Sequence, residues 1–134
     1  MSIAYLDSSA LVKLMVREDE TSALEADLAG RDGLVTSRLA EVECRRAAER
    51  AGNRRLLQRV SDVFDSIYLL DLTAPVLAHA ASLRPSSIRS LDAIHIAAAI
   101  SVGDGELDLI TYDDRMAEAA RANGLRVAQP GRAS

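Results

Sequence analysis

The segment IAYLDSSALVK, residues 3–13, carries the pattern that decides the fold. Its first four residues form a short apolar run, as in a buried strand, and the run stops at Asp7. From Ala10 onward, apolar residues such as Leu11 and Met15 return at helical spacing. The segment therefore predicts a strand, a tight turn and a helix, with an acidic residue at the point where the strand ends.

The same alternation of apolar runs and amphipathic segments continues along the chain. We expect further strands at residues 34–36, 67–72, 107–111 and 125–127, and helices at residues 20–29, 37–51, 56–66, 73–84, 91–100 and 115–122. The strand at 67–72 should be buried. Strands that alternate with helices call for a central parallel β-sheet flanked by helices on both faces, an α/β fold. We expect a single domain over residues 1–128 and a loose tail over residues 129–134.

Helix starts are marked by hydroxyl side chains. Ser37 and Thr73 are expected to cap the helices that follow them. One of Ser86, Ser87 and Ser90 should cap the helix at residues 91–100.

The bulk composition limits the class of protein. With 134 residues, 49% of them hydrophobic and 27% charged, the chain suits one globular domain. Its apolar runs are too short to cross a bilayer and no signal-peptide pattern opens it, so we expect a cytoplasmic protein without a membrane partner. Cys44 is the only cysteine, which excludes an internal disulfide and a cysteine zinc cluster. The net charge of -4 argues against a protein that coats nucleic acid through a general basic field.

Four acidic residues stand where strands should hand over to helices: Asp7, Glu43, Asp92 and Asp113. Taken singly, the three aspartates have the simpler explanation of helix caps or first-turn charges. Glu43 and Asp92 are harder to explain in this way, because helical spacing places both on inward faces, where a charge needs a partner. Ligand sites of parallel sheets lie outside the carboxyl ends of the strands, so all four carboxylates can share one cleft. Carboxylates so close repel one another until a cation neutralises them, and oxygen ligands suit Mg²⁺ or, as a substitute, Mn²⁺.

Basic residues are concentrated in one region. Six arginines crowd together there: Arg45, Arg46, Arg50, Arg54, Arg55 and Arg59. Two interpretations stay open. The stretch is either a solvated helical face or a surface that contacts phosphates or a partner, since a guanidinium binds phosphate and carboxylate through two parallel hydrogen bonds.

These residues together resemble those of a PIN-domain ribonuclease, and more narrowly those of a VapC-type toxin of a bacterial toxin–antitoxin (VapBC) pair. The likeness covers essentially the whole chain and rests on four segments: residues 3–13, SRL at 37–39 leading to Glu43, LDAIHIA at 91–97 and TYDDRM at 111–116. It implies a PIN-like fold, Mg²⁺-dependent cleavage of RNA, a homodimer and inhibition by a cognate VapB-like antitoxin. Promoter DNA would be bound only through the antitoxin.

The resemblance also implies roles for individual residues. It carries over as catalytic, metal-binding acids Asp7, Glu43, Asp92 and Asp113. Ser9 supplies the hydroxyl after the first acid, and Asp114 is expected as a helix cap or an outer acid of the site. Glu43 is preferred to Glu41 because it faces inward and lies at the family's separation from Ser37. Contacts to RNA or to a partner are expected from Arg45, Arg46, Arg89 and Arg115.

The expected reaction is hydrolysis of a phosphodiester bond in single-stranded or loop RNA by a metal-activated water. The products would carry 5′-phosphate and 3′-hydroxyl ends. Asp92 or Glu43 is expected to receive the proton of the attacking water, and Ser9 to orient a bound water.

Two other interpretations use the same acids. Acyl-phosphate chemistry, as in haloacid-dehalogenase-like phosphatases and receiver domains, also sets aspartates at strand ends, but those resemblances expect a lysine late in the chain and Lys13 is the only lysine. In a non-catalytic interaction module, the acids would merely cap helices. His95 lies one helical turn after Asp92, and we expect it to be a packed histidine rather than a ligand.

Overall fold

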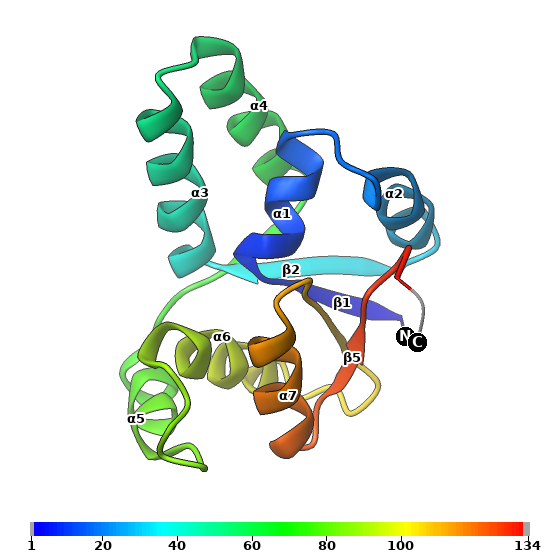
Figure 1. Cartoon of the computed structure of the whole chain (residues 1–134). Coiled ribbons are helices and arrows are strands. Elements are labelled where there is room, and N and C mark those ends of the chain that lie inside the picture. The colour runs from blue at the N-terminus through cyan, green and yellow to red at the C-terminus, as the bar shows by residue number, and fades with distance from the viewer. Residues whose placement is uncertain (1, 133–134) are drawn as a thin grey trace.

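The computed structural model describes residues 2–132 of the chain. Within these residues, five parallel strands form one sheet in the order β3-β2-β1-β4-β5 (Figure 1). The strands are β1 (Ile3–Leu6), β2 (Gly33–Ser37), β3 (Tyr68–Leu70), β4 (Asp108–Ile110) and β5 (Arg126–Ala128). The predicted central parallel sheet is confirmed.

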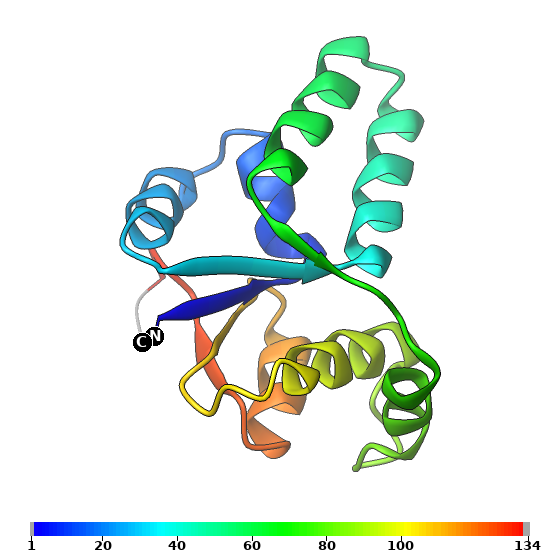
Figure 2. The same cartoon turned by 180° about the vertical axis from the view of Figure 1, so that it is seen from behind.

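Seven helices connect the strands within the described residues. They are α1 (Ser8–Met15), α2 (Thr21–Ala29), α3 (Arg38–Ala51), α4 (Arg54–Asp65), α5 (Ala74–Ser82), α6 (Ser90–Ser101) and α7 (Asp114–Ala122). Helices α1 to α4 cover one face of the sheet, and α5 to α7 cover the other (Figures 1 and 2). The prediction of helices on both faces is therefore confirmed.

The central strand β1 shows why the sheet has a core on each side. Successive side chains of a strand point to opposite faces. Ala4 and Leu6 pack into one core together with Leu11 of α1, whereas Tyr5 packs into the other together with Ile96 of α6. All five side chains are completely buried. The apolar run at the start of the chain is thus a strand covered on both faces.

One predicted strand differs in its burial. The segment 67–72 was expected to be a buried strand, but β3 lies at the edge of the sheet and Tyr68 is 69% exposed. Leu69 and Leu70 are half-buried. An apolar run has the same appearance in a central strand and in a covered edge strand, and only the strand order distinguishes them.

The helix caps differ in part from the prediction. Thr73 caps α5 as expected, with its hydroxyl accepting from the N–H of Val76 at 3.4 Å. Ser37 occupies the cap position of α3, but its hydroxyl does not accept from that helix. At α6 the cap position belongs to Arg89 and not to one of the three serines, again without a side-chain cap bond.

The strand order fixes where a ligand site can form. The chain passes from β1 to β2 on one side, and β4 later adds to the other side of β1. Ligands of parallel sheets bind outside the carboxyl ends of strands at such a reversal. Asp7 follows β1 and Asp113 lies shortly after β4, so both acids lie at this point.

Residues 129–132 lie against the domain. The hydroxyl of Tyr112 donates to the carbonyl of Pro130 at 2.7 Å, and Arg132 forms an ion pair with Asp114 at 3.2 Å. Residues 133 and 134 of the expected tail lie outside the described residues, so its looseness there stays a prediction, as do the domain boundaries. Nowhere in residues 2–132 is there a helix with the length and apolar character needed to cross a membrane.

Candidate active site

A cavity of about 320 Å³ lies beside the ends of β1 and β4. It is lined by the four acids singled out in the sequence, Asp7, Glu43, Asp92 and Asp113. They come from the end of β1, from α3, from the first turn of α6 and from the start of α7. The fold thus brings four acids that are far apart in the sequence to a single cavity.

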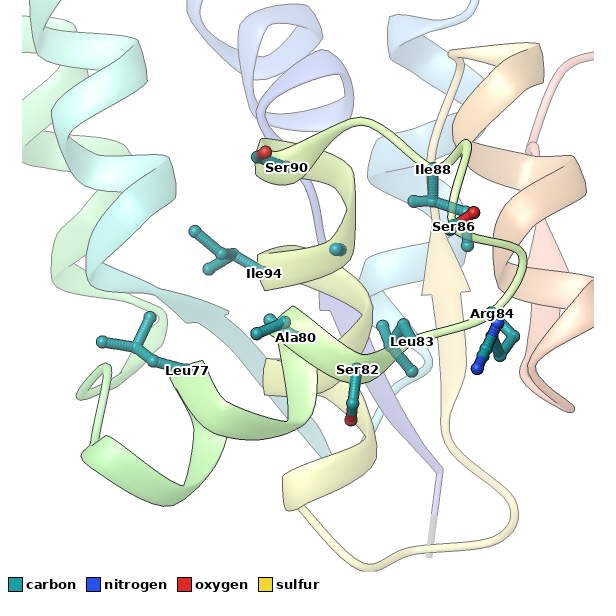
Figure 3. A pocket seen from close by; sticks show the side chains of 11 residues that line it. Leu77, Ala80, Ser82, Leu83, Arg84, Ser86, Ile88, Ser90 and Ile94 are labelled. Atoms are coloured by element: carbon teal, nitrogen blue, oxygen red, sulfur yellow. The ribbon is translucent and has the colours of Figure 1, made fainter.

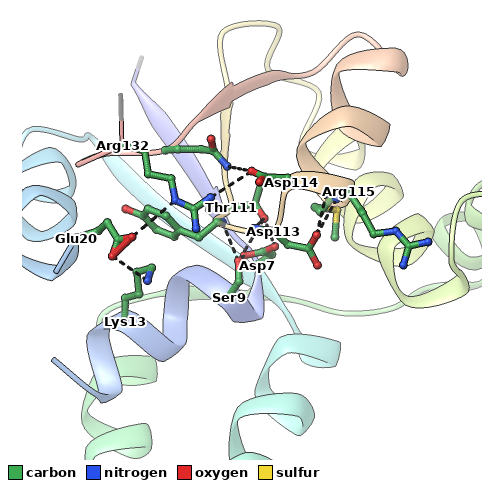
Figure 4. Close-up of polar contacts among 12 residues, drawn as sticks. Asp7, Ser9, Lys13, Glu20, Thr111, Asp113, Asp114, Arg115 and Arg132 are labelled. Carbon is green, nitrogen blue, oxygen red and sulfur yellow. Dashed lines mark hydrogen bonds and ion pairs between the residues drawn. The ribbon is translucent and has the colours of Figure 1, made fainter. Parts of the chain in front are cut away.

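Asp7 is deeply buried, with 3% of the residue exposed. Its Oδ1 accepts from Ser9 Oγ at 2.6 Å and from the N–H of Ala10 at 3.0 Å, and its Oδ2 accepts from Thr111 Oγ1 (Figure 4). Burial raises the pKa of Asp7 above its ordinary value of 3.8, and the hydrogen bonds from Ser9 and Thr111 oppose that rise. Ionised Asp7 therefore gains from any further positive charge that enters the cavity.

The hydroxyls of Ser9, which follows β1, and Thr111, which follows β4, both hold the Asp7 carboxylate. The Ser9 hydroxyl donates to Asp7 and itself accepts from the N–H of Tyr112 at 2.9 Å. Thr111 Oγ1 lies 3.3 Å from Ser9 Oγ, so the hydroxyls form one network. The proton of Ser9 is engaged by Asp7, and the role of Ser9 in orienting a water stays a prediction. The contact of Thr111 with Asp7 was not among the predictions, although the position of Thr111 two residues before Asp113 is a signal that could have indicated it.

Asp113 is held by the start of α7. Its Oδ1 accepts from the N–H groups of Arg115 and Met116 at 2.9 and 3.2 Å. Partial burial raises the pKa of Asp113, but the bonds from Met116 and Arg89 outweigh that effect and leave the pKa below its ordinary value of 3.8. Asp113 is therefore both a helix cap and an ionised member of the cavity wall.

Two neighbouring acids lie outside this cavity. Asp114 is 87% exposed at its side chain and pairs with Arg132, so the helix cap is Asp113 and not Asp114. Glu41 pairs with Arg38 at 3.2 Å and with Arg45 at 3.5 Å. Neither acid lines the cavity. Of the two glutamates on α3, the geometry therefore favours Glu43, as the sequence did.

Arg89 is the only arginine or lysine among the described residues that line the cavity. Its Nε and Nη2 both lie 2.9 Å from Asp92 Oδ2, and Nη2 lies 3.0 Å from Asp113 Oδ2. The Asp92 side chain is only 14% exposed. Arg89 supplies the partner that this half-buried charge required.

Glu43 is contacted by a buried histidine. His95 Nε2 lies 2.8 Å from Glu43 Oε1, and His95 Nδ1 lies 2.8 Å from the hydroxyl of Tyr5. His95 is 2% exposed and also meets the Tyr5 ring edge to face, with centroids 5.9 Å apart. Burial raises the pKa of Tyr5 far above its ordinary value, so the phenol keeps its proton. His95 is packed as expected, yet it also lines the cavity and contacts one of the four acids.

Two of the four arginines expected to bind substrate or partner lie near the acids. A neighbouring cavity of about 270 Å³ shares Arg89 and Asp92 with the acidic cavity and adds Arg115. Arg45 and Arg46 lie on α3 and line neither cavity. The structure thus brings together Arg89, Arg115 and the acids, but not Arg45 or Arg46.

The arginine stretch lies on a helical hairpin formed by α3 and α4, which extends away from the sheet (Figures 1 and 2). Gly52, with φ of 63°, ends α3 in the left-handed conformation that glycine adopts without strain. Five of the six arginines are exposed: Arg46, Arg50, Arg54, Arg55 and Arg59. Exposure agrees with both interpretations of this stretch, which therefore stay open.

A larger cavity of about 600 Å³ lies between α5, α6 and the segment that joins them (Figure 3). Its wall combines apolar side chains such as Leu77 and Ile94 with serines and Arg84. It contains no carboxylate. This cavity therefore lacks the groups that metal-dependent chemistry requires.

The donor set of the acidic cavity suits a hard divalent cation, because its four acids supply oxygen ligands of the kind that Mg²⁺ and Mn²⁺ prefer. In residues 2–132, no three His, Cys, Asp or Glu side chains are already gathered in position to hold a metal ion. The acids point instead at protein donors, with Arg89 across two of them. Arg89 is 46% exposed at its side chain, so it has room to turn away from the acids.

The PIN domain family model matches residues 4–122. The chain belongs to the PIN-domain family. Its relatives include ribonuclease VapC46 of Mycobacterium tuberculosis, 42% identical over 137 residues that cover 97% of this chain and 99% of the relative. Ribonuclease VapC47 of the same organism is 37% identical over 131 residues, covering 95% of this chain and 96% of the relative. These relatives confirm the predicted VapC likeness of this PIN domain.

A solved structure confirms the PIN fold. It is the crystal structure of VapBC2 from Rickettsia felis bound to a DNA fragment from their promoter. One of its chains superposes on this PIN domain with a TM-score of 0.73 and 16% identity, over 94% of this chain and 97% of that one. At this identity the likeness concerns the fold alone.

Proposed function

We propose that this PIN-domain protein is a Mg²⁺-dependent ribonuclease and acts as the toxin of a VapBC-type toxin–antitoxin pair. The observation that carries the proposal is the single cavity lined by Asp7, Glu43, Asp92 and Asp113 in a chain whose relatives are VapC ribonucleases. A non-catalytic module has no need to bring four acids to one cavity. In particular, helix capping accounts for Asp7 and Asp113 but not for Glu43.

A bound Mg²⁺ would supply positive charge at the scissile phosphate and lower the pKa of a water, making it a nucleophile at neutral pH. The chain's own residues would do the rest. Asp7 and Asp113, anchored by N–H groups at the starts of α1 and α7, would hold the cation. Asp92 and Glu43 would complete its binding, and one of them would receive the proton of the attacking water. Cleavage would then leave 5′-phosphate and 3′-hydroxyl ends.

The substrate we propose is single-stranded or looped RNA. Unpaired strands reach a recessed acidic site more readily than a duplex does, and proteins read RNA mainly at such places. Arg115 lines the cavity that adjoins the acidic cavity, and Arg89 lines both cavities. Their guanidinium groups would contact phosphates that flank the scissile bond.

The partners we propose are a second copy of the chain and a VapB-like antitoxin, through which promoter DNA would be bound. The VapBC2 structure, one of whose chains has the same fold, is bound to a DNA fragment from their promoter. Large apolar side chains of this chain are also exposed, namely Val16, Val42, Tyr68, Leu77 and Leu91. Single exposed apolar side chains are common, and only those that lie side by side would form a surface for protein contacts.

The test compares wild type with Asp7→Asn on a pool of cellular RNAs in Mg²⁺. Wild type should produce RNA fragments with 5′-phosphate ends, and both Asp7→Asn and removal of divalent cations by a chelator should abolish them. Glu41→Gln is the matched control, because Glu41 lies on α3 outside the cavity and should be dispensable. Equal cleavage by wild type and Asp7→Asn would overturn the assignment.

A further inference from the structure

Glu43 is anchored differently from the other three acids. Asp7 and Asp113 are held by backbone N–H groups, and Asp92 is held by Arg89 near the start of the same helix. Glu43 lies within α3, away from any helix start, at the end of a longer side chain that is 25% exposed. Its carboxylate contacts His95, which comes from α6 on the other face of the sheet. The position of Glu43 therefore depends on a side chain of a different layer.

His95 is itself held firmly. Both of its ring nitrogens are hydrogen-bonded, Nδ1 to the hydroxyl of Tyr5 and Nε2 to Glu43, each at 2.8 Å. Tyr5 is fully buried in the central strand β1, and its ring packs edge to face on His95. The contacts thus run from β1 through α6 to α3. A histidine bonded at both nitrogens in a buried site has no freedom to rotate without breaking hydrogen bonds.

The network also fixes the tautomer of His95. The Tyr5 hydroxyl donates to Nδ1, which leaves the proton of a neutral ring on Nε2, and that N–H donates to Glu43 Oε1. In this assignment each ring nitrogen of His95 has one hydrogen-bond partner. It engages one oxygen of Glu43 and leaves the other oxygen for a cation.

We propose that His95, oriented by Tyr5, is a positioning residue that holds the Glu43 carboxylate in place for the cation. The inference rests on the proposed function, since it concerns the same acidic cavity. In this role His95 acts on the cation only through Glu43, and Tyr5 acts through His95. Outer partners of this kind orient the groups that bind a metal, and their loss typically lowers metal affinity about 10- to 100-fold.

The experiment measures Mn²⁺ binding by calorimetry on the whole chain without RNA, together with RNA cleavage as a function of Mn²⁺ concentration. In His95→Asn the shorter amide does not reach Glu43, and we expect Mn²⁺ to bind about 10-fold more weakly. His95→Gln places an amide N–H near the position of Nε2 and should restore most of the affinity. Tyr5→Phe should weaken binding to a smaller extent. His79→Asn, on the exposed face of α5, is the control and should bind Mn²⁺ like wild type.

The outcomes separate this inference from the proposed function. If wild type binds Mn²⁺ and cleaves RNA while folded His95→Asn and Tyr5→Phe bind Mn²⁺ as tightly, the positioning role is overturned and the nuclease stands. If wild type neither binds Mn²⁺ nor cleaves RNA, the proposed function fails and the inference fails with it. Should His95→Asn not fold, Tyr5→Phe decides, because unchanged affinity in that variant contradicts an orienting role for Tyr5 through His95. If His95 has only a structural role, His95→Gln should be less stable to heat than wild type and should not bind Mn²⁺ more tightly than His95→Asn.

Discussion

Arg89 Nη2 lies 3.0 Å from Asp113 Oδ2, and this contact joins the starts of two helices. Arg89 occupies the cap position of α6, and Asp113 that of α7. The same guanidinium also contacts Asp92, so it places positive charge beside two of the four acids. A cation that binds these acids must therefore compete with Arg89.

Removing this competitor should strengthen metal binding. In Arg89→Gln the charge beside Asp92 and Asp113 is lost, and we expect Mn²⁺ to bind about 1.5- to 5-fold more tightly, the range that corresponds to the energy of partly exposed ion pairs. Calorimetric titration of the chain with Mn²⁺ measures the change.

A matched variant tests the location of this effect. Arg46→Gln removes the same charge from α3, outside the cavity, and should leave Mn²⁺ affinity unaltered. Weaker Mn²⁺ binding by Arg89→Gln would show that Arg89 supports the acids instead of competing for them.

The buried Asp7 carboxylate should make stability depend on pH. Because its pKa is raised in the folded chain, the folded state holds more protons than the unfolded state between 3.8 and that raised value. Stability should therefore fall as the pH rises through this window. Without divalent cations, Asp7→Asn should be more stable than wild type by about 1 kcal/mol at pH 7, and the difference should shrink toward pH 4.

Urea denaturation at the two pH values checks this expectation. Asp104→Asn, on an exposed loop of the other end of the sheet, is a suitable comparison because it is not part of the cavity. If Asp7→Asn is less stable than wild type at pH 7, the bonds from Ser9 and Thr111 outweigh the cost of burial.

Mg²⁺ should stabilise the wild-type chain by mass action. At a concentration of 100 times its dissociation constant, a ligand that binds only the folded state contributes about 2.7 kcal/mol. The melting temperature should therefore rise with Mg²⁺ in wild type and stay unaltered in Asp92→Asn. An equal rise in both proteins would place the bound ion elsewhere on the chain.

Arg115 should contribute to RNA binding through charge. It is exposed, and it lines the cavity that adjoins the acids. Arg115→Gln should weaken RNA binding at every sequence and lower the slope of log affinity against log salt by about 0.7, the value for one phosphate of a single strand. Fluorescence anisotropy over a salt series measures this in the Asp7→Asn background, which we expect not to cleave the RNA. An unchanged slope would remove Arg115 from the RNA contacts.

The parts of the fold that depend on local pattern could be predicted from the sequence. The apolar run before Asp7 and the helical spacing after it specify a strand and a helix, and repetition of that unit specifies a parallel sheet. The burial of Tyr68 could not be predicted, because it depends on which strand lies at the edge. The prediction of a serine cap for α6 was also wrong. Arg89 occupies the cap position, and none of the three serines near the start of the helix does.

For the candidate site, the sequence predicted which four acids lie together but not the contacts that hold them. Asp7 and Asp113 follow neighbouring strands, so their approach is a consequence of topology. Two of the contacts that fix the acids join residues far apart in the sequence, and the pattern of the chain does not indicate which residues pair. Thr111 reaches Asp7, and His95 reaches Glu43 across 52 positions of the chain. Such pairings become visible only when the helices are placed on the sheet.

The pairing of β1 with β4 has a consequence for the order of synthesis. Asp7 is synthesised before its hydrogen-bond partner Thr111, which follows it by 104 positions, and before the neighbouring Asp113. A polypeptide that stops before β4 lacks Asp113 and therefore one wall of the acidic cavity. If that cavity is the catalytic site proposed above, such incomplete products would have no ribonuclease activity, and only chains that contain β4 and α7 would need to be restrained.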